Sequence, residues 1–176
     1  MMDDLARTIL ADPPWNERGG GKIKRGADRH YPLMKTPEII ELVRPFVTHA
    51  ANPDTHLYLW TTNNFLPDAL TCISSWGYRY ITILTWDKEI IGLGQYFRGQ
   101  TEHLIFAVRG QYVPAKCRTQ STLIRGRRGR HSAKPEEAYA KIEAVSPGPY
   151  LELFARTERP GWTAWGNSPD LFTRFP

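Results

Sequence analysis

Short apolar runs alternate with segments of helical spacing along nearly the whole chain. Runs rich in β-branched and aromatic residues predict strands over residues 8–11, 56–62, 78–86, 102–108, 150–155 and 162–165. Helical spacing, together with residues typical of helix starts and ends, predicts helices over residues 36–49, 63–76 and 134–146. This alternation predicts an α/β fold with helices on both faces of one sheet. No repeat or long linker interrupts it, so we expect residues 1–176 to form a single domain.

Polar segments follow three of the predicted strands, at residues 16–30, 88–101 and 110–134. In an open α/β sheet, ligands bind beyond the carboxyl ends of the strands. We therefore expect all three segments to rise on one edge of the sheet, the edge at which Asp12 follows the first strand.

The composition is that of an ordinary globular protein, with 41% apolar and 23% charged residues. No apolar run approaches the roughly 20 residues of a membrane span, and the first residues, MMDDLARTIL, carry acids where a signal peptide needs bases. We therefore expect a cytoplasmic protein that does not associate with membranes. Cys72 and Cys117 form no CxxC pair and the histidines show no zinc-like spacing with them, so we expect neither a disulfide nor a metal site.

The net charge of +5 is unevenly distributed. Residues 116–134, KCRTQSTLIRGRRGRHSAK, are rich in Lys and Arg and contain no acid. Such a stretch is either a solvated loop or a surface that contacts phosphates, since guanidinium groups bind phosphates bidentately and release counterions. Composition alone leaves these two interpretations even. Under the second, the residues that contact the phosphates of a nucleic acid are Arg127, Arg128 and Arg130.

The first strand ends in the tetrapeptide Asp12-Pro13-Pro14-Trp15. Each residue alone is typical of an ordinary turn, with Trp15 in the core. Together they indicate more, because each proline fixes its own φ and restricts the residue before it. The Asp12 carboxylate and the Pro13 carbonyl would then be two oriented hydrogen-bond acceptors beside an aromatic surface. A planar molecule that carries an NH2 group fits such a site.

At this point the chain resembles the MT-A family of S-adenosylmethionine-dependent methyltransferases, which carry Asp-Pro-Pro-Trp and methylate the exocyclic amino group of adenine. The resemblance continues, in order, through the segments YPLMKTPEI, LYLWTTNNFLPDAL, GYRYITILTWDK, RGQTEHLIFAVRG, HSAKPEEAYAKIEAVSPGPYLELFAR and GWTAWGN. It covers nearly all of residues 10–167. The resemblance implies a Rossmann-like three-layer αβα sandwich in permuted order, with the catalytic motif before the cofactor segment.

The resemblance also implies roles for particular residues. Asp12 and the Pro13 carbonyl would hold the target amino group, with Asp12 also beside the cofactor, and Pro14 and Trp15 would complete the catalytic motif. On the substrate side the matching residues are Tyr31 and Glu102, and Trp15 and Tyr31 would flank the target base. Lys134 matches the lysine that pairs with the methionine carboxylate of S-adenosylmethionine. The remaining cofactor positions, near the ribose and adenine, are Glu152, Arg156, Asn167 and Ser168.

The expected reaction needs no metal. The amino nitrogen of adenine is a poor nucleophile, and oriented acceptors stabilise the positive charge that develops on it during methyl transfer. We expect DNA as the substrate, with RNA as the alternative, and a duplex would have to release the target base from its stack. Two other interpretations remain: methylation of the cytosine amino group, and a non-catalytic nucleic-acid-binding subunit. Longer members of the family have an additional upstream strand, so a homodimer or a partner subunit could complete the pocket here.

Overall fold

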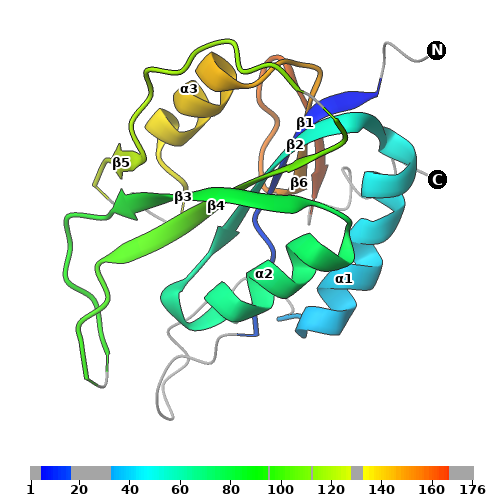
Figure 1. The fold of residues 1–176 in the computed structure, drawn as a ribbon. Helices are drawn as coiled ribbons and strands as arrows, with labels where there is room; N and C mark the ends of the chain where they lie inside the picture. Colours follow the sequence, from blue (N-terminus) through cyan, green and yellow to red (C-terminus); the bar gives the residue numbers. More distant parts are fainter. Residues whose placement is uncertain (1–4, 17–32, 95, 112, 128–132, 167–176) are drawn as a thin grey trace.

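A single mixed sheet forms the centre of the structure (Figure 1). The structure is a computed structural model, and it describes residues 5–16, 33–94, 96–111, 113–127 and 133–166. Within these residues the sheet has seven strands: β1 (Ala6–Ala11), β2 (Ala51–Thr61), β3 (Arg79–Asp87), β4 (Thr101–Arg109), β5 (Leu123–Arg125), β6 (Tyr150–Ala155) and β7 (Trp162–Gly166). The helices are α1 (Thr36–Pro45), α2 (Leu66–Ser75) and α3 (Glu136–Val145), with short helical turns η2 (Phe46–Ala50) and η3 (Asn63–Phe65).

The strand order is β5-β3-β4-β2-β1-β6-β7, and β4 alone among these strands runs against its neighbours. The carboxyl ends of the six other strands and the amino end of β4 therefore share one edge, which we call the carboxyl edge. Asp12 follows β1 directly and stands at the middle of this edge. The site that the sequence predicts is thus built on rigid, central strands.

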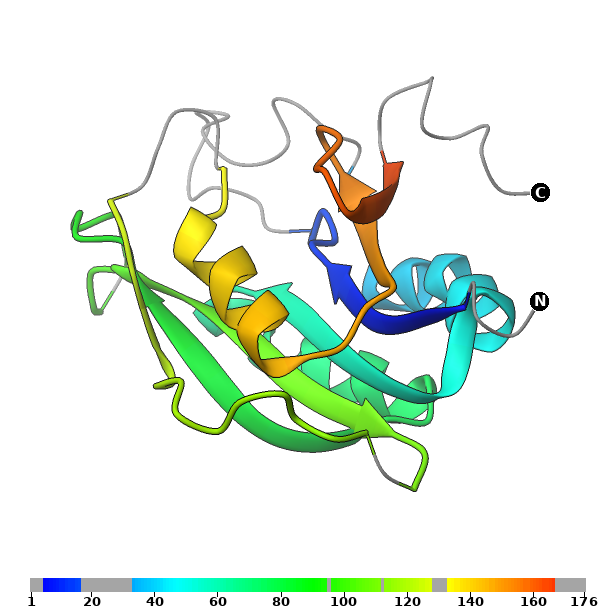
Figure 2. The same ribbon diagram turned by 90° about the horizontal axis from the view of Figure 1, so that it is seen from above.

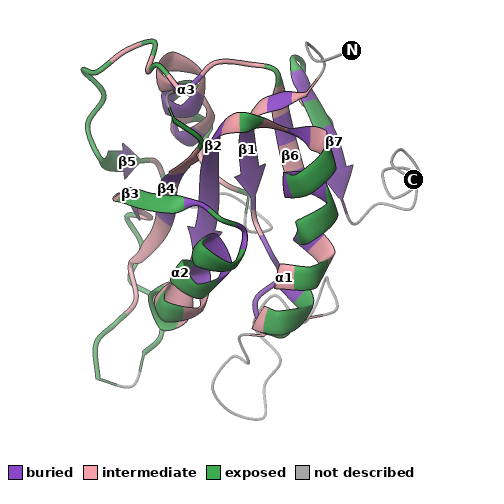
Figure 3. Cartoon of the chain, turned by 45° about the vertical axis from the view of Figure 1, so that its right-hand side comes forward, coloured by how far each residue is buried: buried purple, intermediate pink, exposed green. Residues whose placement is uncertain are grey.

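Alternate residues of the central strands serve two separate cores, as the period of a strand requires. Ile9 and Leu57 pack in the core that lies under α1 and α2. Leu10 and Tyr58, their direct neighbours in the chain, pack in the core under α3. Figure 2 shows α3 on one side of the sheet and α1 on the other, and Figure 3 shows the buried central strands beneath the exposed outer faces of α1 and α2. The predicted three-layer α/β arrangement is confirmed.

The predicted helices and strands are present, with shifts of a few residues at their ends. The run Thr36-Pro37-Glu38 predicts Thr36 as the N-cap of the first helix, but the structure has Lys35 there, and the Lys35 backbone N–H donates to the Glu38 carboxylate at 2.7 Å. Thr36 is instead the first helical residue, and its hydroxyl donates to Asp68 at 2.5 Å, which ties α1 to α2.

The expectation that all three polar segments rise on one edge is wrong for residues 110–122. Because β4 runs antiparallel, its carboxyl end lies on the opposite edge, and the chain reaches the carboxyl edge again only after β5. The polar segment also contains β5 itself, which we did not predict. Its central residue, Ile124, is fully buried under α3. None of the described helices combines the length and the hydropathy needed to cross a bilayer.

Candidate active site

The Asp12 carboxylate lies at the carboxyl edge between β1 and two cationic side chains. Lys134 Nζ is 3.1 Å from Asp12 Oδ1, and Arg156 Nη2 is 3.9 Å from Oδ2. The backbone N–H of Asp12 donates to the Leu153 carbonyl at 3.4 Å, which ties the motif to β6. The carboxylate side chain retains 19% exposure, so it is shielded but still accessible to a ligand.

Backbone and indole contacts anchor the rest of the tetrapeptide. The Trp15 backbone N–H donates to the Pro13 carbonyl at 2.9 Å, so one of the two lone pairs on that oxygen is occupied and one is left. The Trp15 indole is buried, donates to the Trp60 carbonyl at 3.0 Å, and stacks on Phe65 with ring centroids 5.6 Å apart. Its surface therefore belongs to the core, which matches the interpretation of Trp15 as a core residue and not the expected position beside the target base. The tryptophan fixes the motif in place.

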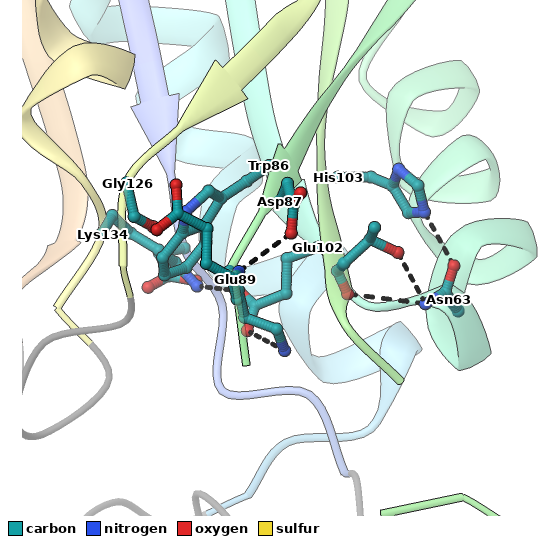
Figure 4. A network of polar contacts seen from close by, with 11 residues as sticks. Asn63, Trp86, Asp87, Glu89, Glu102, His103, Gly126 and Lys134 are labelled. Carbon is teal, nitrogen blue, oxygen red and sulfur yellow. Dashed lines mark hydrogen bonds and ion pairs between the residues drawn. The ribbon is translucent and has the colours of Figure 1, made fainter. Parts of the chain in front are cut away.

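Lys134 connects Asp12 to a second acid, Glu102 on β4, and Figure 4 shows Lys134 beside Glu102. Its ammonium also contacts Glu102 Oε2 at 2.8 Å, and Lys88 Nζ lies 3.3 Å from Glu102 Oε1. The Lys134 ammonium further lies 4.9 Å from the centroid of the Trp60 ring. The four side chains that form this ion cluster, each less than a fifth exposed, are Asp12, Lys88, Glu102 and Lys134.

Charge pairing outweighs burial in the ion cluster. Burial by itself would raise the pKa of Glu102, but the charges and hydrogen bonds of Lys134 and Lys88 hold that pKa below its ordinary value. Burial would likewise lower the pKa of Lys134, but Asp12 and Glu102 raise it above its ordinary value. Lys134 and Glu102 therefore stay ionised at neutral pH, and the site presents fixed charges to whatever binds there.

A second polar group lies where α3 meets the middle of β6. The Tyr139 hydroxyl donates to Glu152 Oε1 at 2.8 Å, and the Arg159 guanidinium lies 3.7 Å from the centroid of the Tyr139 ring. Burial, followed by the charge of Asp12, raises the pKa of Glu152, while the Tyr139 hydrogen bond opposes the shift. Glu152 is thus a partly shielded acceptor near Asp12, oriented by a single strong donor.

The backbone of β6 bends beside this group. Phe154 has a φ of 65°, in the left-handed region that favours glycine, and the pairing of β6 with β7 shifts register between Leu153 and Ala155. The β7 strand ends in Gly166, where a Cβ atom would lie 1.7 Å from the Ala155 carbonyl oxygen, so only glycine allows this approach. Strained backbone often accompanies functional sites, and here the bend directly precedes Arg156.

The structure brings together five of the predicted site residues, at the ends of β1 and β4, in and just after β6, and just before α3: Asp12, Glu102, Lys134, Glu152 and Arg156. Arg127 lies exposed just beyond β5 at the same edge. Outside the described residues are Tyr31, Arg128, Arg130, Asn167 and Ser168. Across the described residues no group of His, Cys, Asp and Glu side chains is arranged to hold a metal ion.

Sequence reasoning missed three members of the site. Lys88 directly follows β3 and lies two residues beyond the predicted strand 78–86, and that position at the carboxyl edge was a usable signal. Tyr139 lies on α3 between two of its buried positions, where a partly buried hydroxyl needs a partner. Trp60 has the sequence pattern of an ordinary core residue of β2. Its position beneath Lys134 depends on long-range packing, which a local sequence pattern does not predict.

Comparison with known proteins adds an independent observation. The MT-A70 family model matches residues 6–168. The type II methyltransferase M.MunI of Mycoplasma sp is 31% identical over 193 aligned residues, which cover 97% of this chain and 81% of that protein. The catalytic subunit of the N(6)-adenosine-methyltransferase of Homo sapiens and its MT-A70-like relative in Drosophila melanogaster are each 27% identical over 186 residues. The aligned region covers 95% of this chain but only 30% and 29% of those two proteins.

Proposed function

The chain belongs to the MT-A70 family, and on this premise we propose that it transfers a methyl group from S-adenosylmethionine to the exocyclic amino group of adenine in DNA. The observation that carries the proposal is the Asp12 carboxylate, which follows a central strand and is held between Lys134 and Arg156. We put DNA first because the relative whose length the chain largely covers is a type II methyltransferase, and RNA second because the N(6)-adenosine methyltransferases are also similar.

The charged side chains of the site fit S-adenosylmethionine, the cofactor of this family. When bound, the cofactor supplies an electrophilic methyl group carried on a sulfonium. Lys134 and Arg156 are the cations suited to its carboxylate, and Glu152, in the middle of β6, is an acceptor suited to ribose hydroxyls. We propose these three residues as its partners, and we extend the proposal to Asn167 and Ser168 on resemblance alone.

Asp12 and Pro13 would act on the target amine. The Asp12 carboxylate and the remaining lone pair of the Pro13 carbonyl accept one N–H each, which turns the nitrogen lone pair out of the ring plane. As the nitrogen gains the methyl group it becomes positively charged, and the carboxylate stabilises that charge. Because the methylated amine is acidic, its proton leaves after the transfer. Removing one such oriented group from an enzyme typically costs about 2.7–4 kcal/mol of transition-state stabilisation.

The remaining residues would hold and align the substrate. Glu102, fixed between two lysines, is proposed to contact the target base, with Tyr31 beside it. The stretch after β5, with Arg127, Arg128 and Arg130, is proposed to bind phosphates. The order along the chain, with the catalytic strand β1 before the cofactor strand β6, supports the proposed permuted form of the Rossmann-like fold.

The test compares Asp12→Ala and Asp12→Asn with the wild type. Both variants should lower the rate of methyl transfer at saturating DNA by about 100-fold to 1,000-fold, while DNA affinity changes by less than about threefold. Asp68→Asn is the matched control, because that carboxylate bonds Thr36 and lies outside the site. Wild-type methyl transfer by Asp12→Ala would contradict the mechanism.

A further inference from the structure

The connection between β3 and β4 carries large apolar side chains into solvent. The four that form this apolar tip are Ile91 (70% exposed), Leu93 (73%), Tyr96 (95%) and Phe97 (90%). Elsewhere among the described residues the large apolar side chain with the greatest exposure is Tyr80, at 46%. Exposing two aromatic rings almost completely is costly in water, so such a patch indicates a binding partner.

The exposure follows from a defined backbone shape. Backbone hydrogen bonds cross the connection from Lys88 to Gln100 at 3.0 Å and from Gly92 to Gly99 at 2.8 Å. At Gly94 a Cβ atom would lie 1.8 Å from the Phe97 carbonyl oxygen, so the close turn there requires glycine. The chain thus folds back on itself and leaves Tyr96 and Phe97 on the outside.

The apolar tip grows directly from the proposed active site. Figure 1 shows the connection standing away from the sheet beyond the carboxyl edge. At its base, the Lys88 ammonium lies 3.3 Å from Glu102, which is joined to Asp12 through Lys134. Tyr96 precedes Gln100 by four residues, so at about 3.3 Å per residue the rings reach up to roughly 13 Å beyond the edge. That reach is comparable to a few base-pair steps.

Basic side chains flank the apolar tip, although Asp87 and Glu89 carry negative charge at the base of the connection. Arg98 is next to Phe97 in the chain, and Arg125 pairs in register with Asp87 at the end of β3. Exposed Arg127 follows at the same edge. Aromatic rings flanked by cations fit a nucleic acid, which offers π-faces and phosphates together, better than they fit an uncharged protein surface.

We propose that Tyr96 and Phe97 insert into the DNA beside the target adenine and stack on the bases that it leaves when it moves into the active site. This inference rests on the proposed function. The two rings replace stacking that the duplex loses, and the ion cluster holds the base of the connection in line with Asp12. The proposal concerns duplex DNA only, because a target base in a single strand does not have to be released.

The test uses Tyr96→Ala/Phe97→Ala on one long DNA of mixed sequence, either native or heat-denatured, since the recognition sequence is not needed. Loss of the rings should reduce methyl transfer to native DNA at least about tenfold, which corresponds to about 1.4 kcal/mol, and transfer to denatured DNA by less than about threefold. Tyr96→Phe/Phe97→Tyr keeps both rings and should restore activity on native DNA. The matched control is Tyr80→Ala/Ile81→Ala, two exposed residues at the far end of β3.

A second readout separates this inference from the proposed function. Permanganate oxidises unstacked thymines, so it reports base displacement without any methyl transfer. Wild-type protein should create reactive thymines in native DNA, and Tyr96→Ala/Phe97→Ala should not. If the wild type transfers no methyl group but shows this ring-dependent reactivity, the proposed function fails and the insertion stands. Equal loss on native and denatured DNA, no effect of the variant, or a changed oligomeric state in the variant would overturn the insertion.

Discussion

Removing the Lys134 ammonium would leave two shielded carboxylates facing each other. Lys134→Met keeps an unbranched side chain near the Trp60 ring and removes the ammonium with its charge and its hydrogen bonds. Because one ammonium contacts both Asp12 and Glu102, the two carboxylates lie within about 6 Å of each other, close enough for strong repulsion. The substitution should therefore destabilise the protein. It should also reverse the direction in which the ionisation of Glu102 makes stability change with pH.

The magnitude follows from the burial of the cluster. Breaking a fully buried ion pair costs about 3–5 kcal/mol. The side chains here retain 13–19% exposure and Lys88 still pairs with Glu102, so we expect a cost below that range, about 2–3 kcal/mol near pH 8. In the wild type the lowered pKa of Glu102 adds stability that is lost only as the pH falls through that pKa. In Lys134→Met, burial and the Asp12 charge should raise this pKa, so stability is lost as the pH rises above about 4.5.

The assay is urea unfolding of both proteins at about pH 5 and about pH 8. The difference in unfolding free energy between wild type and variant should grow with pH, by up to about 1.4 kcal/mol per unit of pKa shift. Lys116→Met is the control, because that ammonium bonds the Glu143 backbone carbonyl rather than a carboxylate. A difference that stays constant between the two pH values would refute the coupling of the two acids through Lys134.

Three further outcomes are expected. Tyr139→Phe removes the donor to Glu152 and should weaken S-adenosylmethionine binding about threefold to tenfold in calorimetry. The loss should be larger at lower pH, because the pKa of Glu152 would rise further and ionised Glu152 is the proposed acceptor for the cofactor. Ser146→Ala removes the hydroxyl that lies 2.7 Å from Nδ1 of buried His56, and it should lower the free energy of unfolding in urea by about 1–3 kcal/mol. In the wild type, burial lowers the pKa of His56, so the stability that neutral His56 contributes is lost as the pH falls below about 6.5. Replacing the three arginines after β5 with alanine should flatten the salt dependence of DNA binding by up to about 0.9 in slope per lost phosphate contact, and an unchanged slope would favour the solvated-loop interpretation. These are Arg127, Arg128 and Arg130.

Much of the fold could be predicted from the sequence because strand and helix periods are local. The run at residues 150–155 forms β6 with the predicted bounds, and the Pro and acid at the start of the first helix identify where α1 begins, although α1 ends four residues before the predicted end. Direction in the sheet has no local signal. The reversed direction of β4 depends on pairing with β2 and β3, so the edge on which residues 110–122 lie could not be read from the chain.

The site also contains residues that a local pattern predicts and contacts that depend on long-range packing. Asp12 could be located because a rigid turn after a buried run lies at a strand end, where ligands bind. The pairing of Asp12 with Lys134 could not, because 122 residues separate them in the chain and the contact depends on how α3 packs against the sheet. β5 was missed for a related reason. Ile124 is an isolated buried residue in a polar stretch, and its strand exists only because β3 has a free edge beside it.

The central claim is methyl transfer to adenine, and it can be tested directly. Wild-type protein is incubated with labelled S-adenosylmethionine and, in parallel, with duplex DNA, single-stranded DNA and RNA, and the digested nucleosides are identified by mass. The account predicts label in DNA as N6-methyladenine, with Asp12→Ala giving almost none. Label in methylated cytosine would contradict the adenine assignment, and no transfer to any of the three substrates would contradict the enzymatic function.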